Sequence, residues 1–570
     1  MKLIGYVFLT ALVLAGCGGG SDSERTDTPT PDIPEVPESP DEENPEEDDS
    51  EEETDGGETP GEDTPPEPAE PVVTLDVETP TVQLLGSVGD ALPISVEGAW
   101  SATDLGDHSL YVRLVDEDGR LVKTAIAEVS EVDRFTLETE LQPTLAVGTH
   151  TGMMTVDACK DEACEGIYSD SSVSLTLQVE LQPVPEWQTH QANASHNGYV
   201  PIWINHSEFT KLWEWQRSES SEPIGGINAP VAGSGQVYIS TDVYNGDAAA
   251  IALDELTGEE TWRLSFGSMP ALNPPAINNS TLFVSTSGHQ DTKVWAISRT
   301  DGRLQFQTKF SSQWGNYLAP TVYEELVYQT GGYYGGQTYA FDINNGAELW
   351  SQGPGTSWGM DSAAVDSRHV YVHSGNKLTI FGKDNGELIG TIDDPFGNNN
   401  YDYHGSPVIG SNNNVIAFSG GAFSGLASSN AEHFDNRVIS NFDIEEQAYL
   451  WTSRFTYRTF FAAAKGVIYA GKESPVALDA IDELTGEVLW SWVSPSTEDT
   501  SFHRNVVLTD NLLFVSTNKN IYAIDLETQE SVWSYGEPGM MSISDNRILF
   551  LAPGARRSDG RLVAFDLRSK

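Results

Sequence analysis

Aromatic, histidine and arginine side chains of the kinds that recognition sites use gather in short segments of the C-terminal part of the chain. Examples are Gln313–Pro320, Ser357–Ala364 and Tyr401–Pro407. Rigid rings with a few polar groups among them suit the binding of peptides or glycans. The candidate residues are Trp314, Tyr317, Tyr333, Tyr334, Trp358, Tyr403, His404, Arg458, His503 and Arg504. The alternative is that these side chains are packing residues, because aromatic clusters only sometimes mark sites.

The patterns of cysteine, histidine and carboxylate residues do not point to metal or redox chemistry. Cys159 and Cys164 flank a four-residue loop, KDEA, with a spacing unlike that of metal or redox pairs, so we expect a disulfide between them. The alternative is a redox or metal pair. Asp361 is a lone carboxylate, and one carboxylate does not make a metal site. His404 and His503 could form a base or ligand pair, but their separation does not follow from the sequence.

These side chains must be positioned by a repeat, whose clearest copy is IALDELTGEETW at Ile251–Trp262. The period is about 40–47 residues with one longer interval, which is typical of four-stranded propeller blades. A truncated copy ends at Lys570, and its missing strand is upstream, at Phe209–Trp215. The other copies are Val294–Phe306, Thr338–Trp350, Leu378–Gly390, Ile439–Trp451, Leu478–Trp490 and Ile521–Trp533.

Each position of the repeat has a physical role. The acidic residue after the alternating strand can cap a tight turn through its side-chain oxygen. The glycine of the turn, such as Gly258 or Gly302, supplies the positive φ that such a turn requires. The final ring can wedge between neighbouring blades and contributes at most about 4–6 kcal/mol by burial. Gly390 lacks this ring, so we expect the fourth blade to pack least well.

The pattern A-x-D-x-x-T-G-x-x-x-W resembles the repeat of the pyrroloquinoline-quinone-type (PQQ-like) eight-bladed β-propellers. The segment WQTHQANASHNGYVP, Trp187–Pro201, resembles the segment that precedes the first blade in that family. The resemblance implies a propeller over about residues 187–570 that is closed by Phe209–Trp215, which removes an exposed edge. In that fold the aromatic segments would lie on one face. The enzymes of the family, as the resemblance implies, carry an adjacent cysteine pair and a calcium site, and this chain has no adjacent cysteines.

The N-terminus has the features of an export signal. Lys2 is followed by an apolar stretch, Leu3–Leu14, that is too short to span a bilayer. Leu14–Cys17, LAGC, resembles a bacterial lipobox, which implies lipid attachment to Cys17 after cleavage of the signal within residues 1–17. No aspartate follows Cys17, and in the family rule this implies the outer membrane, at its periplasmic face or at the cell surface. The alternative is an ordinary signal with a fortuitous cysteine.

Two further regions precede the repeats. Residues 18–71 are rich in Pro, Glu, Asp, Ser and Thr and cannot bury enough apolar surface to fold, so we expect a disordered acidic tether. A cation-binding or acidic interaction tail is the alternative. Residues 72–183 alternate apolar and polar residues between turns, which predicts an all-β sandwich. This region resembles bacterial immunoglobulin-like modules.

Charge and resemblance together limit the function. The formal net charge of −56 argues against nucleic acid as a partner. We expect a non-enzymatic, monomeric outer-membrane lipoprotein with an all-β fold, similar to the propeller lipoproteins of the outer-membrane β-barrel assembly machinery. Its propeller, over residues 184–570, would bind envelope proteins, peptides or glycans; the glycan case is a lectin-like role. The alternative is a quinoprotein dehydrogenase, although the missing cysteine pair makes us expect neither PQQ nor Ca²⁺.

Overall fold

The computed structural model describes most of the chain after residue 69. The described residues are 70–106, 109–129, 134–206, 209–217, 226–243, 245–287, 292–311, 319–331, 337–353, 362–374, 376–396, 406–419, 437–555 and 558–568. Every regular element in these residues is a β-strand, so the protein is all-β as the sequence predicts. Over these ranges there is no helix of the length and hydropathy needed to cross a bilayer. The lipobox cysteine and nearly all of the acidic tether precede them.

The first eight strands form two sheets that share one hydrophobic core. One sheet has the order β1-β3-β6 and the other the order β2-β8-β7-β4-β5, in which only the β2–β8 pair is parallel. Leu75 and Leu137 from the first sheet pack with Val156 and Leu177 from the second. The strands are β1 (Val72–Val77), β2 (Thr81–Ser87), β3 (Pro93–Thr103), β4 (Tyr111–Val115), β5 (Ala125–Glu128), β6 (Arg134–Glu140), β7 (Gly148–Cys159) and β8 (Val173–Gln182).

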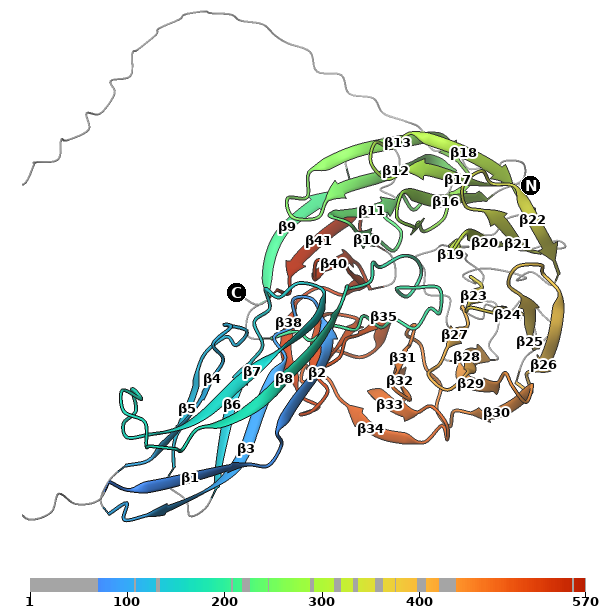
Figure 1. Ribbon diagram of the computed structural model, residues 1–570. Coiled ribbons are helices and arrows are strands. Elements are labelled where there is room, and N and C mark those ends of the chain that lie inside the picture. The colour runs from blue at the N-terminus through green and yellow to red at the C-terminus, as the bar shows by residue number, and fades with distance from the viewer. Residues whose placement is uncertain are drawn as a thin grey trace, which may run out of the picture. The chain divides into compact units, whose positions relative to one another are not determined.

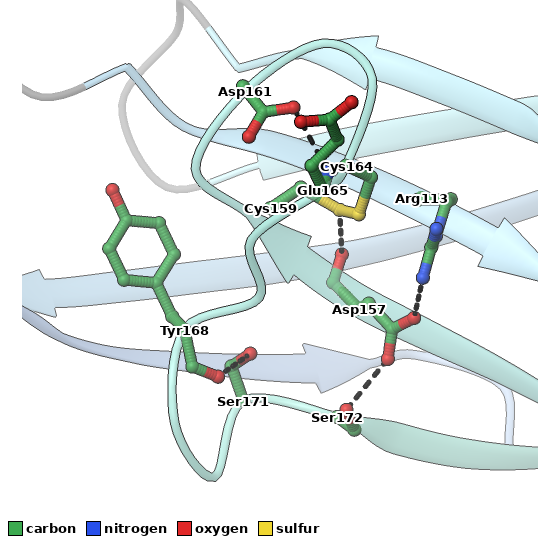
Figure 2. Close-up of a disulfide and its surroundings, with 9 residues drawn as sticks. All are labelled: Arg113, Asp157, Cys159, Asp161, Cys164, Glu165, Tyr168, Ser171 and Ser172. Carbon is green, nitrogen blue, oxygen red and sulfur yellow. Dashed lines mark hydrogen bonds and ion pairs between the residues drawn. A yellow bond between two sulfur atoms is a disulfide. The ribbon is translucent and has the colours of Figure 1, made fainter. Parts of the chain in front are cut away.

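A disulfide closes the loop between β7 and β8 (Figure 2). Cys159 is the last residue of β7, and its Cα lies 5.0 Å from that of Cys164. Beside it, Asp157 accepts hydrogen bonds from Arg113 at 2.8 Å and from Ser172 at 2.7 Å. The predicted pairing of these two cysteines is therefore confirmed, and it fixes the start of the loop that leads into β8.

The remaining strands form eight antiparallel sheets in the described residues, which we number 1 to 8 in chain order (Figure 1). Sheets 1 to 4 are β10 (Val231–Gly233) to β13 (Glu260–Met269), β14 (Ala271–Leu272) to β18 (Leu304–Lys309), β19 (Thr321–Tyr323) to β22 (Glu348–Gln352), and β23 (Ala364–Val365) to β26 (Leu388–Asp393). Sheets 5 to 8 are β27 (Val408–Ile409) to β30 (Ala448–Thr452), β31 (Ala462–Ala464) to β34 (Val488–Trp492), β35 (Phe502–Leu508) to β38 (Ser531–Tyr535), and β39 (Gly539–Ile543) to β41 (Arg561–Asp566) with β9 (Thr210–Gln216).

The remaining strands of these sheets lie between the first and last strands just given. The intermediate strands of sheet 1 are β11 (Gln236–Ser240) and β12 (Gly246–Asp254), and those of sheet 2 are β15 (Ala276–Ile277), β16 (Thr281–Ser287) and β17 (Lys293–Ser298). Those of sheets 3 to 8 are β20 (Leu326–Thr330), β21 (Thr338–Asp342), β24 (His369–Ser374), β25 (Lys377–Gly382), β28 (Asn414–Ser419), β29 (Val438–Asp443), β32 (Val467–Glu473), β33 (Val476–Asp482), β36 (Leu512–Thr517), β37 (Ile521–Asp525) and β40 (Ile548–Pro553).

The turn of the repeat has the geometry that its sequence predicts. In sheet 1, the Asp254 carboxylate accepts hydrogen bonds from the backbone N–H groups of Leu256 and Thr257 at 3.0 and 2.9 Å. Gly258 follows with φ = 72°. Asp482 and Gly486 repeat this arrangement in sheet 6. In these sheets the carboxylate and the glycine together set the two outermost strands at the correct angle.

The ring that ends each repeat joins one sheet to the next. Trp262 of sheet 1 lies against Gly302 of sheet 2, and its indole N–H donates to the Arg299 carbonyl at 2.8 Å. A Cβ on that glycine would collide with the indole, so the glycine serves both the turn and the contact. The same indole-to-carbonyl bond is made by Trp213 to Glu255, Trp350 to Lys383, and Trp451 to Glu483.

The junction between sheets 4 and 5 departs from this rule in both partners. Sheet 4 has Gly390 where the ring should be, and sheet 5 has Gln447 where the turn glycine should be. The Gln447 side chain reaches the space beside Gly390, with its own backbone at φ = 49°. The sequence predicts that sheet 4 packs least well because it lacks the ring. At this junction the Gln447 side chain of sheet 5 occupies the space beside Gly390 instead.

The last sheet is completed by a strand from far upstream. β9 pairs antiparallel with β41, with Trp213 opposite Ala564, as the sequence predicts. Trp213 then bonds across to sheet 1. Along the axis, inner strands of successive sheets contact one another from sheet 1 to sheet 5 and from sheet 6 to sheet 8, and β39 of sheet 8 contacts β10 of sheet 1.

A buried ion pair connects the β2–β3 turn to sheet 8. Arg547, in the β39–β40 turn, pairs with Asp90 and donates to the carbonyls of Val88 at 2.7 Å and Trp203 at 2.8 Å. Gly89 lies so close that a Cβ there would meet the guanidinium. Burial raises the pKa of Asp90 above its usual value, and the charge of Arg547 acts in the opposite direction. The pair is costly to desolvate, so removing either partner would leave an uncompensated buried charge.

Candidate functional site

The predicted recognition residues divide into two groups. Arg458, His503 and Arg504 lie within the described residues. The other seven, and the lipobox cysteine, lie outside them: Trp314, Tyr317, Tyr333, Tyr334, Trp358, Tyr403, His404 and Cys17. The described part of the candidate site therefore consists of these three side chains and of the residues at the axis of the ring beside them.

A single segment, Trp187–Val200, which we call the axial strap, crosses the middle of the ring of sheets (Figure 1). It begins on sheet 1, where Trp187 and Ala232 exchange backbone hydrogen bonds of 2.9 and 3.1 Å. The backbone of Ile277 in sheet 2 then donates to the Gln188 carbonyl at 2.7 Å. In sheet 3, the Pro320 carbonyl accepts from the Thr189 hydroxyl at 2.6 Å.

The second half of the strap continues around the ring. The Ala194 carbonyl accepts from Val365 of sheet 4 at 2.8 Å, and the Ser195 carbonyl accepts from Ile409 of sheet 5 at 2.9 Å. Asn197 accepts from sheet 6 and Gly198 from sheet 7. Sheet 8 is reached through Asn505, whose side chain bonds both to Gln191 and to the Met541 backbone. The strap thus contacts seven sheets directly and the eighth through one side chain.

Two histidines of the strap are held neutral near the axis. His196 is fully buried, with Nδ1 donating to the Pro407 carbonyl at 3.1 Å and Nε2 lying 3.2 Å from the Thr321 hydroxyl. Burial lowers the pKa of His196 to about 4. His190 packs edge-on against Phe460 and His196, and burial, helped by the nearby His196, holds its pKa well below the usual value. Both imidazoles are therefore uncharged at neutral pH.

The space beside the strap is small. A cavity of about 10 Å³ lies between the strap and the inner strands of sheets 1, 2 and 8. Its walls include Trp187, His190, Pro230, Pro274 and Met540. This volume is about that of one water molecule, so the strap packs closely against these inner strands.

The three described candidate residues are engaged in contacts within the protein. Arg458, which precedes β31, pairs with Glu473 at the end of β32 in the same sheet. Arg504 donates to the Gly554 carbonyl at 2.9 Å, and the His503 ring lies 2.8 Å from the Ser501 hydroxyl. His503 and Arg504 are both buried. In the described residues these side chains therefore support sheets 6, 7 and 8 around the axis.

A buried polar cluster beside them does not follow from any sequence pattern. Lys472 is buried and pairs with Asp479, which also accepts from the Tyr457 hydroxyl at 2.7 Å and the Ser491 hydroxyl at 2.7 Å. The Lys472 ammonium lies 4.2 Å from the centre of the Phe455 ring. Burial, with Asp479 adding to it, raises the pKa of Tyr457 far above its usual value. The only hint in the sequence is that Asp479 stands within a strand that is otherwise apolar.

The quinoprotein alternative concerns metal-ligating and cysteine residues. No group of three or more His, Cys, Asp or Glu residues that could hold a metal ion occurs in the part of the chain that the structure describes. Cys159 and Cys164 are bonded to each other in the region before the eight sheets. Asp361 and His404, which the sequence offers as a lone carboxylate and as one half of a histidine pair, lie outside the described residues.

Comparison with known proteins agrees with this fold. Residues 246–492 match the family described as "Outer membrane protein assembly factor BamB". Tetrathionate hydrolase of Acidithiobacillus ferrooxidans is 20% identical over 425 residues, which cover 63% of this chain and 81% of the hydrolase.

Solved structures to which the chain is similar include BamB from Moraxella catarrhalis, at 15% identity with a TM-score of 0.43, which covers 63% of this chain and 100% of BamB. A europium-containing methanol dehydrogenase matches at 13% identity with a TM-score of 0.48, covering 67% of this chain and 98% of the enzyme. The family match, together with the four-stranded antiparallel sheets, supports PQQ-like β-propeller repeats of the BamB type over residues 246–492.

Proposed function

We propose that this protein is a non-enzymatic binding scaffold of the bacterial cell envelope. In this proposal the eight sheets are the blades of one closed propeller, and β1–β8 form an immunoglobulin-like domain before it. A lipid on Cys17 anchors the chain to the outer membrane, and residues 18–71 are the tether. The match of residues 246–492 to the BamB family supports a scaffold, because the description of that family names an assembly factor.

The axial strap is the observation that carries the proposal. A hub that performs chemistry needs polar side chains directed at a substrate, held in a cavity from which water can be excluded. Here the polar groups at the level of the strap hold the strap itself, as Thr189, Gln191 and His196 do. Beside the inner strands of sheets 1, 2 and 8 the strap leaves a cavity of only about 10 Å³. Recognition is therefore assigned to the loops at the face where the chain enters the inner strands.

The partners are envelope proteins, peptides or glycans that contact this face. The sequence predicts Trp314 and Trp358 for this face, and rigid rings contribute binding area at low entropic cost. The high negative charge disfavours nucleic acid and anionic lipid as partners. The propeller acts as a monomer in this proposal, and β9 completes its last sheet by pairing with β41.

The proposal is tested by site-specific photo-crosslinking in intact cells. A photoreactive amino acid is placed at position 314 or 358 and, as the control, at position 261, which lies on the outer strand β13. The proposal requires a discrete crosslinked product at 314 and 358 that is absent at 261. Equal labelling at all three positions, or none at any, would count against recognition by this face. A Cys17→Ser variant, which should leave the membrane fraction, tests the lipid anchor.

A second candidate is hydrolysis of sulfur oxyanions, favoured by the similarity to tetrathionate hydrolase. Its test is direct: the purified full chain is incubated with tetrathionate, and loss of the substrate is followed over time. A parallel incubation with PQQ, Ca²⁺ and a redox dye tests the quinoprotein alternative. Protein-dependent turnover in either assay, abolished by heat denaturation, would replace the scaffold proposal with an enzyme.

A further inference from the structure

Four consecutive sheets carry an exposed aliphatic side chain at the same place in the repeat. Leu349, Ile389, Leu450 and Leu489 of sheets 3 to 6 are 53%, 43%, 41% and 54% exposed, and we call them the apolar rim. Each immediately precedes the position of the wedging ring on the outermost strand. At this position sheets 1 and 2 have Thr261 and Gln305.

The apolar rim is part of a wider asymmetry around the ring. Among the described residues, the exposed large apolar side chains of the eight sheets fall on sheets 2 to 6, apart from Leu256 of sheet 1. The described parts of sheets 7 and 8 have none. Single exposed apolar residues are ordinary, but their recurrence in one register gives each of these four outer strands an apolar contact point.

The backbone beneath the rim is also available. The outermost strands β22, β26, β30 and β34 each stand at the end of their sheet order, so their outer edges are unpaired within the described residues. Natural proteins usually protect such edges with lysine or proline, because an unpaired strand is a template for another strand. None of these four strands contains lysine, arginine or proline.

The charges of the rim select the kind of partner. Glu348, Glu387 and Glu487 are exposed beside the rim residues. Lys383, in the turn before β26, is already paired with Glu324 and Asp384. A second copy of the chain would bring the same carboxylates to the rim, and the acidic run Asp41–Asp55 would be repelled in the same way. Charge complementarity therefore requires a basic partner.

We propose that the apolar rim binds an extended segment of a partner protein in which aliphatic and basic residues alternate. The backbone of the partner would pair with one outer strand, β22, β26 or β34, where an aliphatic side chain would contact the rim residue of that strand and a basic one would face Glu348, Glu387 or Glu487 beside it. This surface is separate from the loop face of the proposed function. Either surface can therefore fail its test without affecting the other.

The test is a binding titration with the full chain. The probe is a short fluorescein-labelled peptide of alternating leucine and lysine, with a leucine–glutamate peptide of equal length as the charge control. We expect the lysine peptide to bind and the glutamate peptide not to bind. In the variant Leu349→Ser, Ile389→Ser, Leu450→Ser, Leu489→Ser, the Kd for the lysine peptide should rise at least about tenfold, because the apolar contact that supplies affinity is lost.

Matched variants separate the rim from general effects. The control variant places serine at four exposed apolar residues of β1–β8 and the loops between them, Leu85, Ile126, Val147 and Met153, and should bind as the wild type does. A charge variant, Glu348→Gln, Glu387→Gln, Glu487→Gln, keeps the apolar rim and should weaken binding in a salt-dependent way. An equal Kd for the rim and control variants would overturn the proposal. So would self-association of the wild type, seen in sedimentation, that the rim substitutions abolish.

Discussion

The stability of the ring should fall on mild acidification because of the strap histidines. An unperturbed histidine has a pKa of about 6.5, and His196 in the folded chain titrates at about 4. The unfolded chain therefore binds a proton at His196 over the interval from about pH 6.5 to about pH 4, while the folded chain does not. The stability that neutral His196 contributes is present above pH 6.5 and is lost as the pH falls through this interval.

The size of the effect follows from the same two values. Each pH unit within the interval removes about 1.36 kcal/mol per histidine. Between pH 6.5 and pH 5, where ordinary carboxylates remain ionised, His196 alone should cost about 2 kcal/mol, and the whole interval about 3.4 kcal/mol. His190 acts in the same direction. Asp90, Glu255 and Asp545, whose pKa values are raised by burial, act in the opposite direction, so a comparison of variants is needed.

Urea unfolding of the full chain at a series of pH values between 7 and 5 measures this dependence. The His196→Gln variant should be less stable than the wild type at pH 7, and its stability should fall less steeply between pH 6.5 and 5. The His206→Gln variant, which alters an exposed histidine outside the strap, should keep the slope of the wild type. If the slopes for His196→Gln and the wild type are equal within error, His196 is not a buried neutral group, and the role assigned to it in the strap is wrong.

Three further predictions concern the contacts that join the sheets. Trp262→Phe keeps a ring against Gly302 but leaves the Arg299 carbonyl without its indole donor. The free energy of unfolding should therefore fall by about 1–2 kcal/mol. No change in urea unfolding would contradict the role of the indole N–H. Gln447→Ala should lower the free energy of unfolding by about 1 kcal/mol more than Gln529→Ala does. Both glutamines have a positive φ, but Gln447 also fills the space beside Gly390. Equal losses would show that this contact contributes nothing. Arg547→Ala should lower the free energy of unfolding by about 3–5 kcal/mol, because Asp90 stays buried without its partner. Adding Asp90→Asn should recover part of that loss. If it does not, lost packing and not the unpaired charge sets the cost.

The amino-acid sequence by itself determines the features that rest on neighbouring residues. The Asp254 turn depends on a carboxylate, two neighbouring N–H groups and one glycine, all within five residues, so the sequence pattern alone predicts its geometry. The Cys159–Cys164 disulfide is short-range for the same reason. The pairing of β9 with β41 is long-range, but it was predictable because the last copy of the repeat lacks a strand and a matching one stands upstream.

The tertiary structure decided what depends on partners that are distant in the chain. No pattern in Trp187–Val200 shows that its carbonyls would meet sheets 4, 5, 6 and 7 in turn, since each acceptor finds a donor more than a hundred residues away. In the sequence, Gly390 in place of a ring and Gln447 in place of a glycine look like two separate departures from the repeat. In the structure their sheets are adjacent, and the Gln447 side chain fills the space beside Gly390. Turns and strand alternation depend on neighbouring residues in the sequence. The contacts of the strap, and the contacts between adjacent sheets, depend instead on which surfaces the tertiary structure brings together.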